Sequence, residues 1–226
     1  MSKQQTKALL LGKGRVGTTL TTMLANEFEF DWLDLRFGAS VGCQNRGLTS
    51  LDRLSVDLLD GYDLVINCLP CAYVEEVLSV VADSKCGYVD FSSDHHYISE
   101  QSRYRDAFQD RLALINTGIA PGLDNLLVRH LAEVGAKTIH LYLIEHSEDI
   151  DSEPSWCEED GISSATELPV SASNGNLVTH SLFSDPETID TQRGRFCCYR
   201  FFGEEMLTLA RRFPDIELHL KTGGNE

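Results

Sequence analysis

The feature that most constrains the fold is a glycine-rich segment that directly follows the apolar run at residues 8–11. It consists of Gly12, Lys13, Gly14, Arg15, Val16 and Gly17. Beyond it, apolar residues recur at helical spacing, at Val16, Leu20, Met23 and Leu24. This order predicts a strand, a glycine turn and a helix, which together begin a dinucleotide-binding βαβ unit. We predict that the N–H groups of the helix's first turn face the pyrophosphate of NAD or NADP. The alternative is a glycine turn without a ligand.

A second strand is predicted at residues 30–35. Its acidic residue Asp34 lies where a contact with the adenosine ribose is expected, about 20 residues after the first glycine. Arg36 follows shortly after. A carboxylate favours the free 2′-hydroxyl of NAD, whereas a guanidinium can pair with the 2′-phosphate of NADP. The choice of cofactor therefore stays open, as does the simpler interpretation that Asp34 caps the strand and Arg36 lies in solvent.

Composition limits the classes of function. The chain has 226 residues, 42% of them hydrophobic and 24% charged, as in a globular protein with a sizeable core. Its net charge of −16 should repel nucleic acid and anionic membranes. No apolar run approaches the roughly 20 residues of a membrane-spanning helix, and residues 1–7 do not resemble a secretory leader. The acidic runs at 145–153 and 158–160 lack the spacing of a calcium loop. We therefore expect a cytoplasmic protein that binds neither nucleic acid nor membranes and holds no metal.

Strand-like and helix-like patterns alternate along the first half of the chain. Strands are predicted at residues 64–67, 87–91 and 112–116, and a helix follows Pro70. The apolar face of that helix consists of Val74, Val77, Leu78 and Val81. The alternation predicts an α/β fold with a Rossmann-type doubly wound, mainly parallel sheet over residues 1–124.

The second half of the chain is richer in strands. A helix is predicted at residues 123–133, followed by strands at 138–144, 177–183 and 195–201 and a helix at 204–212. This pattern predicts a smaller α+β domain over residues 125–226, which would bind substrate or form a dimer.

Polar residues cluster where the parallel strands end, which is where ligands of such sheets bind. Candidate cofactor contacts at these ends are Asn67, Cys68, Leu69, Pro70 and Ser92. Candidate general acids or bases are Asp90, Asp94, His95 and His96. Adjacent side chains usually point apart, so at most one of the two histidines is expected to face the site.

The seven cysteines are an odd number, and no secretory leader is expected from residues 1–7, so we expect reduced thiols. Cys68 and Cys71 have the spacing of a thiol oxidoreductase and lie at a predicted helix start. No second pair completes a zinc site. We favour a role for these residues in lining the cofactor site, with disulfide chemistry as the alternative.

Several motifs in order give the chain a resemblance to the saccharopine dehydrogenase and reductase-like oxidoreductases. The glycine segment is similar to that family's cofactor turn, residues 63–70 to its strand ending in Asn-x-x-Pro, and residues 88–92 to its Tyr-Val-Asp-x-Ser/Thr motif. Residues 118–127 resemble the Pro-Gly turn before the helix that links the two domains. Residues 155–161 and 203–209 resemble a tryptophan-containing segment and a later strand-to-helix turn.

The resemblance implies NAD(P)-dependent hydride transfer at a C–N bond of an amino-acid-like substrate, in a protein that dimerises with a second copy. It also implies that residues 67–70 lie along the nicotinamide and that Asp90, Ser92, Ala120 and Pro121 shape the cleft between domains. Ala120 and Pro121 are expected to contact the cofactor there. The chain departs from the family in two ways. Ala120 stands where some members have Asp, and the sequence ends where longer members continue through the substrate domain. A second hypothesis is therefore a dinucleotide-binding or assembly module without turnover.

Overall fold

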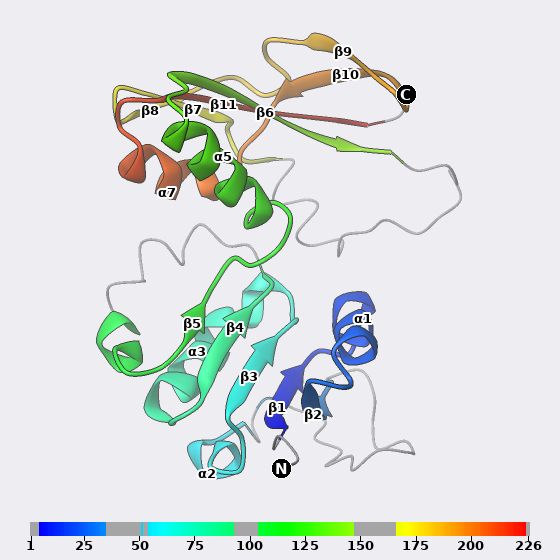
Figure 1. Ribbon diagram of the computed structural model, residues 1–226, viewed down its shortest axis with the longest axis vertical. Coiled ribbons are helices and arrows are strands. Elements are labelled where there is room, and N and C mark those ends of the chain that lie inside the picture. The colour runs from blue at the N-terminus through cyan, green and yellow to red at the C-terminus, as the bar shows by residue number, and fades with distance from the viewer. Residues whose placement is uncertain (1–4, 35–50, 52–53, 93–103, 147–165, 225–226) are drawn as a thin grey trace. The chain divides into compact units, whose positions relative to one another are not determined.

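The computed structural model of this chain describes residues 5–34, 51, 54–92, 104–146 and 166–224 (Figure 1). Contacts divide the chain into two compact units, Met1–Thr117 and Gly118–Glu226. The domain boundary expected between residues 124 and 125 remains a prediction. Among the described residues, no helix has the length and apolar character needed to cross a membrane.

Unit 1 alternates strands with helices, as predicted. Its described elements are β1 (Thr6–Leu11), α1 (Arg15–Met23), β2 (Phe28–Leu33), α2 (Val56–Leu59), β3 (Leu64–Asn67), η2 (Cys71–Tyr73), α3 (Val74–Asp83), β4 (Gly87–Asp90), η3 (Arg105–Phe108) and β5 (Ala113–Leu114).

The strands of unit 1 form a parallel sheet in the order β2-β1-β3-β4-β5. The chain leaves β1 toward β2 and later returns to the other side of β1 as β3. The strand order therefore reverses next to β1, and the crevice at such a switch point is where ligands of doubly wound sheets bind. The predicted α/β fold with a doubly wound parallel sheet is confirmed.

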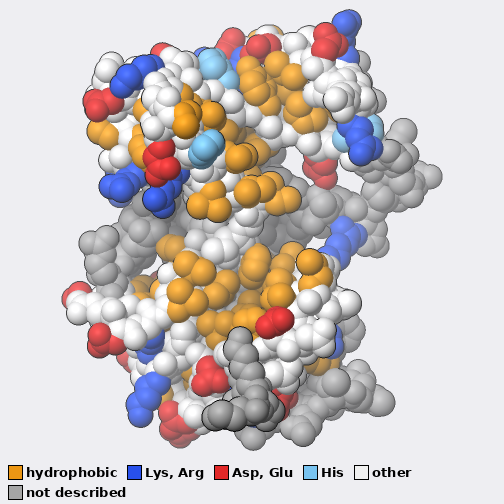
Figure 2. Space-filling view, viewed as in Figure 1, with side chains coloured by type: hydrophobic (Ala, Val, Ile, Leu, Met, Phe, Trp, Pro, Cys, Tyr) orange, Lys and Arg blue, Asp and Glu red, His pale blue; other side chains and the backbone are white. Residues whose placement is uncertain are grey.

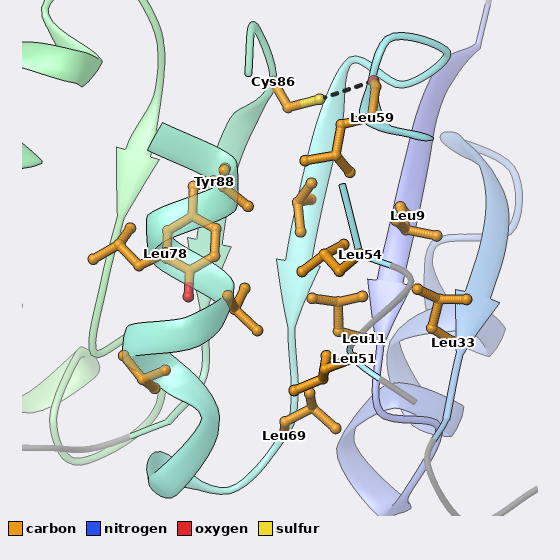
Figure 3. Packing of buried hydrophobic residues seen from close by; sticks show 14 of the residues in the cluster. Leu9, Leu11, Leu33, Leu51, Leu54, Leu59, Leu69, Leu78, Cys86 and Tyr88 are labelled. Carbon is orange, nitrogen blue, oxygen red and sulfur yellow. Dashed lines mark hydrogen bonds between the residues drawn. The ribbon is translucent and has the colours of Figure 1, made fainter. Parts of the chain in front are cut away.

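Alternate residues of the strands enter two apolar cores on opposite faces of the sheet. Leu9 and Leu11 of β1 belong to the larger core, which also holds Tyr88 of β4 (Figure 3). Val77 of α3 belongs to the same core. Ala8 and Leu10 belong to the smaller core, with Leu64 and Ile66 of β3. Helix α3 buries all four residues of its predicted apolar face, Val74, Val77, Leu78 and Val81.

Helix α1 forms where it is predicted but does not bury the expected face. Val16 is 47% exposed and Met23 is 74% exposed. Leu20 packs against the smaller core, and the buried residue of the helix is Gly17. The helix lies so close to the sheet at Gly17 that contact is made through the backbone, and the larger apolar side chains beside it remain outside the core.

Unit 2 consists of a mixed sheet with two helices on one of its sides (Figure 1). Its described elements are α5 (Leu123–Glu133), β6 (Thr138–Glu145), β7 (Val170–Ser173), β8 (Asn176–Thr179), β9 (Glu187–Thr191), β10 (Gly194–Arg200), α7 (Glu205–Arg212) and β11 (Glu217–Gly224). Val128 of α5, Met206 of α7 and Leu218 of β11 are fully buried in the shared core.

Strand β11 organises the sheet of unit 2. It pairs in parallel with β6 along its whole length, so β7 and β10 share its opposite edge, at Leu218 and at residues 221–224. Most of the other pairings are antiparallel. Strands β7, β9 and β11 are not predicted from the sequence, because their polar residues and glycines obscure the alternation that marks a strand.

Candidate functional site

The glycine turn after β1 has no room for side chains at two of its positions. The Gly12 N–H donates to the Leu33 carbonyl oxygen at 2.7 Å, and Gly12 has a φ of +86°, where residues other than glycine are strained. A Cβ atom at position 12 would lie 2.8 Å from the Cys68 carbonyl oxygen. A Cβ atom at position 17 would overlap the Gly12 carbonyl oxygen. The turn therefore packs closely against the ends of β2 and β3, and its positions 12 and 17 accommodate only glycine.

The first turn of α1 offers backbone donors to an anion. Gly14 is the N-cap residue and provides no side-chain cap, and no acidic residue lies in the first turn. The first N–H groups of a helix have no partner within the helix, and the helix dipole adds positive potential there. Arg15 and Val16 are exposed beside them. These features fit a dinucleotide pyrophosphate, which the backbone can approach because no side chain intervenes.

Asp34 directly follows β2 and holds the glycine turn. Its Oδ2 accepts a hydrogen bond from the Lys13 N–H at 2.7 Å, and the residue is only 3% exposed. The Lys13 ammonium lies 4.6 Å from the centre of the Trp32 ring. The end of β2 is thus linked to the turn through both the main chain and the side chain of Lys13. Arg36 lies outside the described residues.

Asn67, the last residue of β3, joins the ends of neighbouring strands. Its Oδ1 accepts a hydrogen bond from the Leu69 N–H at 3.2 Å, and its Nδ2 donates to Asp90 Oδ2 at 3.2 Å. The side chain is fully buried. Asn67 therefore holds the chain in place where it leaves β3 and turns toward Pro70. Cys68, in this segment, lies next to Gly12 of the glycine turn.

Asp90, the last residue of β4, is fully buried and accepts four hydrogen bonds. Its Oδ2 accepts from the Tyr88 hydroxyl and from Asn67, and its Oδ1 accepts from the N–H and the hydroxyl of Ser92 at 2.7 and 2.6 Å. The Asp90 carbonyl oxygen accepts from the N–H and hydroxyl of Thr117. These hydrogen bonds and the complete burial show that the Asp90 side chain joins the ends of β3 and β4. Its role as a general acid or base remains a prediction. Asp94, His95 and His96, the other acid–base candidates, lie outside the described residues.

Cys68 and Cys71 are both free thiols. Burial, and to a smaller extent the Asp90 carboxylate, raises the pKa of Cys68 from 9.0 to about 12. Redox-active cysteines need a lowered pKa, because the thiolate is the reactive form. This environment disfavours disulfide chemistry and is consistent with Cys68 as a wall residue beside Gly12.

Ala120 and Pro121 belong to unit 2, in a tight turn before α5. Their peptide bond is cis, and Gly122 has a φ of +141°. The Gly118 carbonyl oxygen accepts from the Leu123 N–H at 3.0 Å. The roles of Ala120 and Pro121 in cofactor binding remain predictions.

A buried acidic pair in unit 2 has no signal in the sequence. Glu205 in the first turn of α7 is 2% exposed, and Asp124 in the first turn of α5 is 4% exposed. Burial, followed by the charge of Asp124, raises the pKa of Glu205 well above its ordinary value of 4.5. Asp124 Oδ2 and Glu205 Oε1 are both buried and have no hydrogen-bond partner, so a proton retained on Glu205 lowers the cost of burying two acidic groups near each other. The pair lies at the starts of the two helices.

We expect the substitution Glu205→Gln to flatten the pH dependence of stability. Because the folded protein holds the Glu205 proton more tightly than the unfolded chain, wild-type stability should fall as pH rises from about 4.5 through the raised folded pKa. Glutamine can donate to Asp124 without a titrating proton. Urea unfolding of both proteins from pH 4.5 to 9 measures the difference, with the exposed Glu133→Gln as control. A variant with the wild-type slope that is less stable at pH 8 would contradict the retained proton.

Comparison with known proteins places the fold. No protein-family model matches the chain, and no curated protein sequence matches it. The solved structure of apo saccharopine dehydrogenase (L-Glu forming) from Saccharomyces cerevisiae matches 96% of this chain with a TM-score of 0.71 and 19% identity. The chain has the fold of saccharopine dehydrogenase. It spans 55% of the length of that enzyme. The resemblance derived from the sequence motifs is thus confirmed at the level of the fold.

Two other dehydrogenase structures match with lower scores. UDP-N-acetylglucosamine 3-dehydrogenase from Acidithiobacillus ferrooxidans has a TM-score of 0.51 and 11% identity, with 98% of this chain and 70% of that chain covered. Aspartate semialdehyde dehydrogenase II from Vibrio cholerae has a TM-score of 0.50 and 13% identity, with 99% and 68% covered. The saccharopine dehydrogenase fold of this chain is therefore related to architectures found in several dehydrogenases.

Proposed function

We propose that this chain binds a nicotinamide dinucleotide and acts as an NAD(P)-dependent oxidoreductase at a C–N bond of an amino-acid-like substrate. The observation that best supports binding is the glycine turn before α1. Positions 12 and 17 have no room for a Cβ atom, and no side chain caps the N-terminus of α1. The fold of saccharopine dehydrogenase supports the reaction class. The cofactor would supply the hydride acceptor or donor at its nicotinamide ring.

The residues of unit 1 would contribute mainly by positioning. The N–H groups of the first turn of α1 would bind the pyrophosphate. Asn67 and Asp90 would hold the ends of β3 and β4 so that residues 67–70 keep a fixed surface beside the nicotinamide. We propose Asp90 as a positioning residue and leave proton transfer to Asp94 or His96, the remaining candidates of the sequence analysis.

We also propose a cytoplasmic homodimer. Exposed apolar side chains supporting self-association lie on helix α5, which is on the visible face of unit 2 (Figure 2); they are Leu123, Leu126, Leu127, Leu131 and Val134. Contiguous apolar surface of this kind commonly marks an interface. Sedimentation at micromolar concentration of the wild type and of a Leu127→Glu variant would test the dimer.

The first test of the function is titration of the purified chain with NADH and NADPH, followed by nicotinamide fluorescence and thermal stability. We expect saturable binding and an increase in melting temperature with at least one of them. In a Gly14→Val variant the branched side chain would obstruct the α1 N-terminus, and binding should be lost. Amino acids and secondary amines would then be screened for reduction of NAD or NADP.

Absence of binding by either cofactor would overturn the proposed function. Binding without amine-dependent reduction would favour the alternative of a dinucleotide-binding or assembly module without turnover.

A further inference from the structure

Strand β6 forms a free edge of the unit 2 sheet. Among the described residues it pairs with β11 alone, in parallel along its whole length. The Glu217 N–H donates to the Lys137 carbonyl oxygen at 2.8 Å, so the odd-numbered residues of β6 direct their N–H and C=O groups toward β11. The even-numbered residues, from Thr138 to Ile144, direct theirs outward. The outer side of β6 is therefore a row of main-chain donors and acceptors that a further strand can bind.

The other two edges of the described sheet are protected against strand addition, whereas β6 is not. Strand β9 carries Glu187 and Asp190, and charges on an edge strand discourage pairing. Strand β8 is only four residues long. Strand β6 has eight residues, and residues 138–144 include no Lys, Arg, Asp, Glu or Pro. An edge of this length and composition favours pairing with another strand.

Helix α5 adds an apolar surface at the same edge. It packs against β6, whereas α7 packs against β7, β8 and β11 on the same side of the sheet (Figure 1). Val128 of α5 is fully buried, while Leu127, Leu131 and Val134 are exposed beside it. Because α7 does not cover these three side chains, they lie on the flank of α5 that faces away from α7. This flank is the one at the free edge of β6.

We propose, on the basis of the homodimer proposed above, that two copies pair along β6 in antiparallel orientation and so join their unit 2 sheets into one. Directly opposite residues of an antiparallel pair lie on the same side of the sheet, so the twofold axis passes through a residue of β6. With the axis at Leu141, the paired segments are residues 138–144, which include no Lys, Arg, Asp or Glu. Moving the axis by one residue in either direction would place Lys137 or Glu145 opposite an apolar residue.

A second copy fits this edge better than an extended peptide does. With the axis at Leu141, Ile139 of one copy lies opposite Leu143 of the other, and this apolar row continues the core beneath α5. Neighbouring strands are about 4.8 Å apart and packed helices about 8–10 Å apart, so α5 helices above two adjacent β6 strands come into contact. A peptide would pair with β6 and leave the exposed side chains of α5 uncovered. A second copy covers both.

The test separates main-chain pairing from side-chain contacts at His140, whose N–H points outward from the sheet. His140→Pro removes this N–H without removing a hydrogen bond to β11. The matched control His140→Ala keeps the N–H and removes the ring. Sedimentation measures the dimer dissociation constant, and circular dichroism checks that each variant is folded. We expect His140→Pro to raise the dissociation constant by about 100-fold or more and His140→Ala by less than about tenfold.

Amide hydrogen exchange of the wild type tests the same pairing without a substitution, so the proposal stays testable even where His140→Pro does not fold. The N–H groups of His140 and Tyr142 should be protected in the dimer. Dilution below the dissociation constant should speed their exchange by about tenfold or more. The N–H groups of Leu141 and Leu143, which point toward β11, should stay protected at both concentrations.

Three results would overturn the strand pairing. The first is fast exchange at His140 and Tyr142 in a dimer, and the second is an equal effect of the proline and alanine variants. The third is a dimer that Leu127→Glu disrupts and a folded His140→Pro does not, which would place the interface on α5 alone. A monomeric wild type would overturn this inference together with the proposed homodimer. Titration of the same sample with NADH and NADPH keeps that outcome distinct from a failure of the proposed cofactor binding.

Discussion

The substitution Gly17→Ala should abolish dinucleotide binding and lower the free energy of unfolding by about 3 kcal/mol or more. The new Cβ atom would overlap the Gly12 carbonyl oxygen and lie 3.0 Å from Leu10 Cδ2. One of these atoms belongs to the backbone of the glycine turn and the other to a fully buried side chain, so neither can move cheaply. Helix α1 would have to shift away from β1, and the N–H groups of its first turn would move with it.

Urea unfolding followed by circular dichroism measures the stability, and fluorescence titration with NADH and NADPH measures the binding. Gly61→Ala is the matched control, because a Cβ atom there meets nothing within 4 Å. We expect it to change stability by less than about 1 kcal/mol and to leave binding intact. A Gly17→Ala protein with wild-type stability and affinity would contradict the close packing of α1 on the sheet.

The substitution Asp90→Asn should lower the free energy of unfolding by about 3 kcal/mol. In either orientation the amide would direct an N–H group at another N–H group, either that of Ser92 or that of Asn67. The side chain is fully buried, so water cannot replace the lost hydrogen bond. Strands β3 and β4 would lose the carboxylate that joins their ends, and dinucleotide affinity should fall as well.

Asp83→Asn, at the exposed end of α3, is the control and should change stability by less than about 0.5 kcal/mol. Urea unfolding of the two variants compares a buried with an exposed carboxylate. If Asp90→Asn kept wild-type stability and cofactor affinity but lost amine-dependent reduction, Asp90 would instead be the acid–base residue named in the sequence analysis.

Local patterns predict an element well where one of its faces is buried or a turn marks its start. Helix α3 has four apolar residues at helical spacing, and all of them enter the core. Helix α5 has the predicted bounds, 123–133, because the Pro-Gly turn marks its start. Strand β11 has a polar and glycine-rich C-terminal half, and neither its existence nor its central place in the second sheet follows from its own residues.

The candidate site shows the same division. The glycine spacing predicts the turn at residues 12–17 and its place after a strand, since the close approach of Gly12 and Gly17 involves residues that are near in sequence. The hydrogen-bond partner of each polar side chain cannot be predicted in this way. Asp34 and Asp90 are candidate ribose and acid–base residues in the sequence, and in the structure both accept hydrogen bonds from buried backbone or side-chain donors.

The sequence alone therefore determined the parallel α/β architecture, the glycine turn and the kind of cofactor proposed, because these depend on hydrophobic periodicity and on spacing along the chain. Only the tertiary structure decided which carboxylates are buried, that Lys13 lies between the turn and Trp32, and that burial and the charge of Asp124 raise the pKa of Glu205. The physical reason is that pKa values and hydrogen-bond partners depend on burial and on residues distant in sequence, which the fold brings within a few ångströms of one another.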